Sequence, residues 1–272
     1  MKQSLFTLCL VLTLTACSSA PEKKEQLTEK QYYEDAQAAM DNNRFLLAIE
    51  KLQSLESRYP FGRYADQAQL ELVYSYYRTI DFESAAVTAE RFIRLHPDHS
   101  DLDYAYYMKG LASYSVDRGL VERFIPTDFS ERDMGAARES FDDFNRLINR
   151  FPKSRYAEDA RQRMIYLRNL MAAYELKAAL FYMTRGAYIA AAKRSTFIVE
   201  NYDRTPSLPD ALAVMTKAYL ELGLTDLASS SEQTLAYNFP QHKELSSGKL
   251  RYTPRSQKKT TLLNAVTFGL FD

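Results

Sequence analysis

The fold is decided by FLLAIEKLQSLESRYP at residues 45–60 and by its counterpart FESAAVTAERFIRLHP at residues 82–97. Each stretch begins with Phe, has Ala three residues later, and reaches Pro twelve residues after that Ala. The same spacing recurs in Thr225/Ala228/Pro240 and, with three extra residues, in Met134/Ala137/Pro152 and Tyr188/Ala191/Pro206. A small residue lets two helices cross closely, and Pro ends a helix because it lacks the N–H for the next hydrogen bond. The spacing therefore predicts antiparallel helix pairs that repeat along the chain.

The rest of the chain supports an all-α fold. After residue 27 apolar residues recur at i, i+3, i+4 and i+7, and no segment alternates convincingly with period two. The pattern resembles the tetratricopeptide repeat, a helix–turn–helix unit of about 34 residues, although some units here are longer. We therefore expect an α-solenoid of about five such repeats with about ten helices. A non-repeating all-helical domain is the alternative.

Composition excludes several classes of function. The 35 basic residues balance the 35 acidic ones, which argues against nucleic-acid binding through bulk positive charge. Glycine-rich phosphate loops and Gly-x-Ser-x-Gly elbows do not occur. The single cluster of metal-ligand types, from His96 to Asp103, is expected to be a repeat turn rather than a metal site, because Pro97 interrupts it. The sequence thus predicts a protein that is not an enzyme and uses no cofactor or metal.

The amino terminus has the features of a membrane address. Residues 1–16 contain one Lys and then an apolar run too short to span a bilayer, which fits a signal peptide. Leu14-Thr15-Ala16-Cys17 resembles the lipobox of bacterial lipoproteins, in which the cysteine becomes lipidated. We expect a covalent lipid on Cys17, a flexible tether over residues 17–27, and, because Ser18 follows the cysteine, the periplasmic face of the outer membrane. An ordinary secretory signal is the alternative.

The remaining boundaries follow from breaks in the helical pattern. Residues 28–240 are expected to form the solenoid, with amino-terminal repeats at 28–118, an insertion loop at 119–131 and carboxy-terminal repeats at 132–240. The loop holds Phe124, Ile125 and Phe129, which either pack back on the solenoid or contact a partner. Ser130 or Asp128 is expected to cap the helix that follows.

Residues 241–272 form a basic tail with six basic and two acidic residues, a net charge of +4. Its end, Thr260–Phe271, places Leu262, Leu263, Val266, Leu270 and Phe271 on one side of a possible short helix. The tail could cap the last repeat, contact a partner or lie on anionic lipid. The first two are favoured, because the lipid on Cys17 would already anchor the protein.

Aromatic residues suggest a binding surface. In helix–turn–helix solenoids the first helices of successive units line the concave side, and Tyr and Arg combine contact area with hydrogen bonding. Tyr76, Phe82 and Phe92 are assigned to the core between repeats by their phase. The candidate substrate-peptide groove consists of Tyr64, Gln67, Glu71, Tyr74, Arg78, Tyr104 and Tyr107. For each of these residues, packing between helices is an equally good interpretation.

Several motifs together resemble the BamD (ComL-type) family of outer-membrane lipoproteins. They include Arg58-Tyr59-Pro60-Phe61-Gly62-x-Tyr64, Arg91-Phe92-Ile93-Arg94-Leu95, Pro152-x-Ser154-x-Tyr156 and Arg185-Gly186-Ala187-Tyr188. The resemblance covers roughly Cys17 to Pro240, and the long tail departs from it.

The resemblance implies a non-enzymatic subunit of the β-barrel assembly machinery. Its amino-terminal repeats would bind the targeting segment of unfolded outer-membrane proteins. Its carboxy-terminal repeats would bind the periplasmic part of the barrel subunit, with Arg194 as a candidate contact, and accessory lipoproteins would lie along the solenoid. A solvated helix charge is the alternative for Arg194. The alternative function is a general periplasmic scaffold lipoprotein, for instance in peptidoglycan or envelope organisation.

Overall fold

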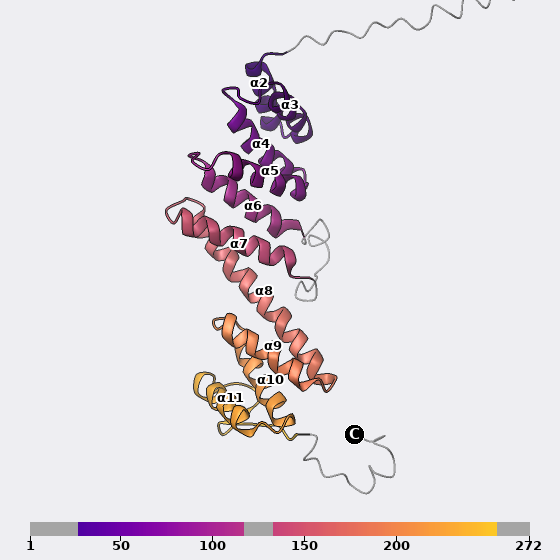
Figure 1. Ribbon diagram of the computed structural model, residues 1–272, viewed down its shortest axis with the longest axis vertical. Helices are drawn as coiled ribbons and strands as arrows, with labels where there is room; N and C mark the ends of the chain where they lie inside the picture. Colours follow the sequence, from indigo (N-terminus) through magenta and orange to yellow (C-terminus); the bar gives the residue numbers. More distant parts are fainter. Residues whose placement is uncertain (1–26, 117–132, 255–272) are drawn as a thin grey trace, which may run out of the picture. The chain divides into compact units, whose positions relative to one another are not determined.

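The computed structural model describes residues 27–116 and 133–254 (Figure 1). Within these ranges it contains ten helices, which confirms the predicted all-α fold and helix number. They are α2 (Glu29–Asp41), α3 (Phe45–Arg58), α4 (Ala65–Arg78), α5 (Phe82–Leu95), α6 (Leu102–Val116), α7 (Gly135–Arg150), α8 (Ala157–Thr184), α9 (Tyr188–Asn201), α10 (Leu208–Glu221) and α11 (Thr225–Asn238). The signal peptide, Cys17, the loop 119–131 and the segment Thr260–Phe271 lie outside the described residues.

The repeated prolines end the second helix of each pair, as predicted. Helices α3, α5, α7 and α11 end at Tyr59, His96, Phe151 and Phe239, and each of these C-cap residues directly precedes a proline. Their φ values lie between −124° and −134° and their ψ values between 57° and 63°, outside the α-helical region that a following proline disfavours. Helix α9 differs, because its C-cap is Tyr202 and the three extra residues lie in the turn before Pro206.

The predicted small residues lie where neighbouring helices contact each other, but in α7 a different small residue takes this position. Ala48, Ala85 and Ala191 are completely buried, and Ala228 is nearly so. Counted from its C-cap, α7 places Ser140 rather than Ala137 in the equivalent position, because this helix begins two residues earlier than α3 does. Ser140 is also completely buried, and its hydroxyl donates to the carbonyl of Gly110 at 2.9 Å.

Gly110 shows how close this crossing is. A Cβ at Gly110 would lie 2.7 Å from Cε1 of Phe144, a buried residue of α7.

The expected cap of α7 was wrong, since its N-cap is Met134 and makes no side-chain capping bond. Neither Ser130 nor Asp128 is near enough in sequence to fill that position.

The chain divides into two compact units, residues 1–68 and 69–272. In the first unit, α2 packs on α3, and the turn after α3 is held by polar contacts to the start of α2. Glu29 accepts a hydrogen bond from the backbone N–H of Tyr64 at 2.7 Å, and the ring of Tyr64 stacks on Tyr33 at 4.5 Å. A Cβ at Gly62 would overlap the Glu29 carboxylate, so a larger residue at this position would have to displace that side chain.

In the second unit, neighbouring helices from α5 to α11 pack in sequence, and α10 also contacts α8. Phe92 is completely buried in one core cluster, and Tyr76 and Phe82 pack partly buried against another, as expected. Helix α8 is unusually long at 28 residues, which accounts for the long repeat around it. Among the described residues, no helix combines the length and apolar character needed to cross a bilayer.

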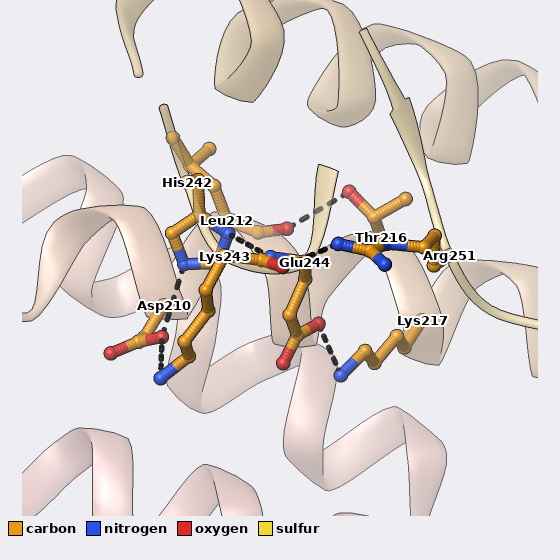
Figure 2. A network of polar contacts seen from close by, with 8 residues as sticks. All are labelled: Asp210, Leu212, Thr216, Lys217, His242, Lys243, Glu244 and Arg251. Atoms are coloured by element: carbon orange, nitrogen blue, oxygen red, sulfur yellow. Dashed lines mark hydrogen bonds and ion pairs between the residues drawn. The ribbon is translucent and has the colours of Figure 1, made fainter. Parts of the chain in front are cut away.

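Residues 241–254 form a short β-hairpin against α10 and α11, a feature that the sequence analysis did not predict. Strands β1 (Leu245–Ser246) and β2 (Lys249–Leu250) pair antiparallel. Ser247 and Gly248 between them have φ values of 52° and 76°, and positive φ at both central residues is typical of two-residue hairpin turns. Figure 2 shows His242 and Lys243 converging on the carboxylate of Asp210, each at 3.1 Å. The start of the predicted tail therefore covers the last helix pair.

Candidate functional site

The predicted groove residues fall in both units. Tyr64 and Gln67 belong to the first, where Tyr64 is stacked on Tyr33 and Gln67 is exposed. The other five, Glu71, Tyr74, Arg78, Tyr104 and Tyr107, belong to the second. Within that unit they lie on α4 and α6.

Tyr74 and Arg78 form a pair on α4, as their spacing of four predicts. Arg78 donates to the Tyr74 hydroxyl at 2.6 Å, and its guanidinium lies 5.5 Å from the centre of that ring. Tyr104 of α6 lies near this pair, since its electrostatic neighbours include Tyr74 and Glu71. Burial is the main cause that raises the pKa of Tyr104 well above its ordinary value. The nearby Tyr156, Tyr74 and Glu71 add to this rise. Glu71, Tyr74 and Tyr104 are therefore brought together.

Tyr107 joins α6 to the start of α8. Its ring stacks on Tyr156 at 4.6 Å with an interplanar angle of 16°. Its hydroxyl donates to Asp159 at 2.7 Å, and Arg163 donates to the same oxygen of Asp159 at 2.6 Å. Burial and the hydrogen bond to Asp159 raise the pKa of Tyr107 to about 12. Burial acts to raise the pKa of Asp159, but hydrogen bonds from Arg163 and Tyr107 outweigh it and leave that pKa below its usual range.

The contact continues along both helices. Tyr114 of α6 packs edge-on against Tyr166 of α8, with a centroid separation of 6.0 Å, and the Arg163 guanidinium lies 5.2 Å from the Tyr114 ring. Two parallel rows thus face each other, and together we call them the Tyr–Arg stripe. The stripe consists of Tyr104, Tyr107 and Tyr114 on α6 and Tyr156, Asp159, Arg163 and Tyr166 at the start of α8.

The α8 half of the stripe was not predicted. Its members recur at i, i+3, i+7 and i+10 from Tyr156, so a search for polar and aromatic residues on one helical face would have found them. The stripe combines exposed aromatic surface with charged groups already held by neighbours. Tyr166 is 40% exposed, and the Asp159 side chain is 47% exposed. Such a surface is suited to binding an extended peptide by ring contacts and hydrogen bonds.

Arg194 is an ion-pair partner within the chain and not simply a solvated charge. Its Nη1 donates to Oε2 of Glu175 at 2.7 Å, and Arg138 lies 3.6 Å from the other oxygen of the same carboxylate. Glu175 is only 2% exposed, whereas the Arg194 side chain remains 42% exposed. The hydrogen bond to Glu175 raises the pKa of Arg194 further. Glu175 on α8 therefore ties α7 and α9 together through two arginines.

The turn with the metal-ligand residue types is a packed one. His96 and His99 both lie against the ring of Phe92, at centroid distances of 4.7 and 5.1 Å. In the parts of the chain that the structure covers, no group of three or more His, Cys, Asp or Glu is arranged to hold a metal ion.

Comparison with known proteins identifies the family. A model described as YfiO, outer membrane lipoprotein, matches residues 25–235. Proteins named outer membrane protein assembly factor BamD are similar along most of the chain. The one from Vibrio cholerae serotype O1 is 39% identical and covers 87% of this chain and 98% of its own. The one from Neisseria meningitidis serogroup A is 38% identical, with 88% and 92% covered.

A further relative of the same name, from Xylella fastidiosa strain Temecula1, is 33% identical over 93% of this chain and 87% of its own. Among solved structures, a thermophilic TPR protein of Thermus thermophilus gives a TM-score of 0.37 at 14% identity, over 79% of this chain and 93% of that one. The family matches the sequence-based expectation of an outer-membrane lipoprotein that acts as a scaffold rather than an enzyme. This chain belongs to the YfiO family of outer membrane lipoproteins.

Proposed function

We propose that this protein is the lipid-anchored scaffold subunit of an outer-membrane β-barrel assembly machinery. In this proposal residues 1–16 are removed, Cys17 carries the lipid, and residues 17–27 tether the repeats of 28–240, including the loop 119–131, to the membrane. The names of its relatives, outer membrane protein assembly factor, support the assignment. The observation that carries it is the Tyr–Arg stripe beside Tyr74 and Arg78, because it supplies a polar aromatic surface for an extended chain.

The substrate would be the targeting segment of an unfolded outer-membrane protein. Its aromatic side chains would pack against Tyr74, Tyr104 and Tyr107, while Arg78 and Arg163 would hydrogen-bond its backbone carbonyls or a carboxylate. Glu71 belongs to the same proposed site, and Tyr64 and Gln67 are proposed as substrate contacts on the first unit. The Tyr and Arg side chains lose few rotamers on binding where neighbours already hold them in place, which reduces the entropic cost of recognition.

The carboxy-terminal helices would contact the periplasmic part of the barrel subunit, with Arg194 at the contact, and accessory lipoproteins would bind along the repeats. The exposed part of Arg194 is available for this role, while Glu175 fixes its direction. A guanidinium held in one orientation can bind a second carboxylate with little further ordering.

The substrate site is tested by Tyr74→Ala combined with Arg78→Ala. The test measures photocrosslinking of the lipoprotein to a peptide with the aromatic carboxy-terminal sequence of an unfolded outer-membrane protein. Each lost contact of this kind typically costs about 1–2 kcal/mol, so crosslinking should fall about fivefold or more. The matched control is Tyr237→Ala with Arg204→Ala, since both residues are exposed and lie outside the proposed site. Equal crosslinking of the two double variants would refute the assignment.

A further inference from the structure

A groove of about 420 Å³ runs along one face of α9. Six α9 residues line it, at i, i+3, i+4, i+7, i+8 and i+11 from Ile189 to Glu200. Tyr219, at the end of α10, and Leu222 and Leu224, just after it, line the other side. This spacing is one continuous helical face, which suits the apolar side of an amphipathic segment.

Three large apolar residues of this groove are open to solvent. Ile189 is 62% exposed, Phe197 is 41% exposed and Leu224 is 44% exposed. Side chains this large are normally covered when they cluster, so the groove is expected to hold another segment. Lys193 and Glu200 lie on the same face and leave the site without a strong net charge.

The described part of the tail leads to one end of the groove. Figure 2 shows residues 242–244 fixed on α10 through Asp210 and through Lys217, which pairs with Glu244. Further on, the Tyr252 hydroxyl hydrogen-bonds Glu221, the last residue of α10. Leu222, the next residue, is part of the groove lining. The Tyr252 side chain therefore contacts the residue next to the groove lining, two residues before Pro254, where the described residues end.

The sequence after Pro254 has the composition that this groove requires. Arg255, Lys258 and Lys259 come first, and cations are favoured near the C-terminal end of a helix such as α10. Leu262, Val266 and Leu270 then recur every four residues. The groove is roughly 16 Å long, because positions 189 and 200 at its two ends are eleven residues apart on α9. The five residues 255–259 can extend to about 17 Å, slightly more than this length.

We propose that Thr260–Phe271 of the same chain binds in this groove, with Leu262, Val266 and Leu270 against Ile189, Phe197 and Leu224. A segment tethered so close by has an effective concentration on the order of millimolar, which favours it over a second copy of the protein. The bound segment covers the face of α9 next to Arg194. The tail is therefore a built-in competitor for whatever partner binds this face.

The test crosslinks the segment to the groove in the full lipoprotein. The natural cysteines are Cys9 and Cys17 only, and in the proposed lipoprotein Cys9 is removed and the Cys17 sulfur carries the lipid, so Phe197→Cys with Val266→Cys places a unique pair of thiols for a short bismaleimide. The matched control is Tyr237→Cys with Val266→Cys, because Tyr237 on α11 is 87% exposed and outside the groove. The first pair should crosslink within one chain at least tenfold faster. Equal rates, or crosslinks between two chains, would overturn the proposal.

A second measurement does not depend on the crosslinker. In the single variant Phe197→Cys, the rate of alkylation reports how well the groove is covered. Adding Leu262→Asp and Val266→Asp should raise this rate at least fivefold, whereas Asn264→Asp, on the opposite side of the segment, should leave it unchanged. The apolar-to-acidic changes lie outside α2–α11, so helix content measured by circular dichroism serves as the control for folding. An unchanged alkylation rate would also overturn the proposal.

Discussion

Replacing Arg194 by Leu separates its contact with Glu175 from any contact with a partner. Breaking a buried ion pair by removing one partner typically costs about 3–5 kcal/mol. Here the Arg194 side chain is 42% exposed, and Arg138 still lies 3.6 Å from the carboxylate, so the loss is reduced to about 1–2 kcal/mol. Amide exchange in α9, measured by mass spectrometry, should therefore accelerate about 5–30-fold.

Glu175→Gln supplies the control. The amide has nearly the shape of the carboxylate but needs no counter-charge, so Glu175→Gln with Arg194→Leu should exchange within about threefold of the wild type. Co-purification with the barrel subunit then decides the role of Arg194. If Arg194 contacts the partner, both Leu variants lose the complex equally. If the double variant regains both slow exchange and the complex, Arg194 acts only through the fold, and the partner contact is refuted.

Three further predictions address the fold and the stripe. Gly110→Ala adds about 1 kcal/mol of helix propensity but places a Cβ 2.7 Å from Phe144, and overpacking of this kind costs about 1–3 kcal/mol. The urea midpoint of unfolding should therefore fall, and it should recover in part when Phe144→Leu is added. A raised midpoint would contradict the close crossing of α6 and α7. The neutral Tyr107 phenol is favoured in the folded state, so its contribution to stability is complete below pH 10 and is lost as the pH rises towards 12. Asp159→Asn should lower the pKa of Tyr107 towards 10, measured as the phenolate absorbance difference against Tyr107→Phe. An unchanged pKa would argue against the hydrogen bond from Tyr107 to Asp159. Truncation after Lys249 should lower the thermal midpoint by several degrees relative to truncation after Pro254, since only the former removes Tyr252 from Glu221 and the N–H of Leu250 from Glu232; equal midpoints would show that the hairpin does not stabilise α10 and α11.

The helix pairs could be predicted because their signals are local. The alanine lies within one helix, and the aromatic eleven residues later and the proline after it directly follow that helix, so their spacing carries over directly into structure. The register of α7 was misassigned because its extra residues lie at the start of the helix and not in the turn, a difference that counting to the proline does not reveal. The hairpin was missed because each strand has only two residues, too few for an alternating pattern.

Individual contacts of the candidate site were predictable only where they stay within one helix. Tyr74 and Arg78 are four residues apart, and their contact follows from helix geometry alone. Tyr107 and Asp159 are 52 residues apart, and Arg194 and Glu175 are 19 apart on different helices. Those pairings depend on how α6 meets α8 and how α8 meets α9, which propensity and periodicity leave open.

The polar groups of the Tyr–Arg stripe already have partners, and this limits how tightly a peptide would bind. The Tyr107 hydroxyl and the Nε–H of Arg163 both donate to Asp159, so a peptide that takes either of these hydrogens replaces a contact, and only the remaining N–H groups of Arg163 can add one. An exchange of hydrogen bonds contributes little net free energy, whereas covering the ring faces removes apolar surface from water. Affinity would then come mainly from the rings, and the polar groups would set the peptide's direction. A receptor that hands an unfolded chain to a barrel subunit has to release it, and a surface that gains little from its polar contacts meets that requirement.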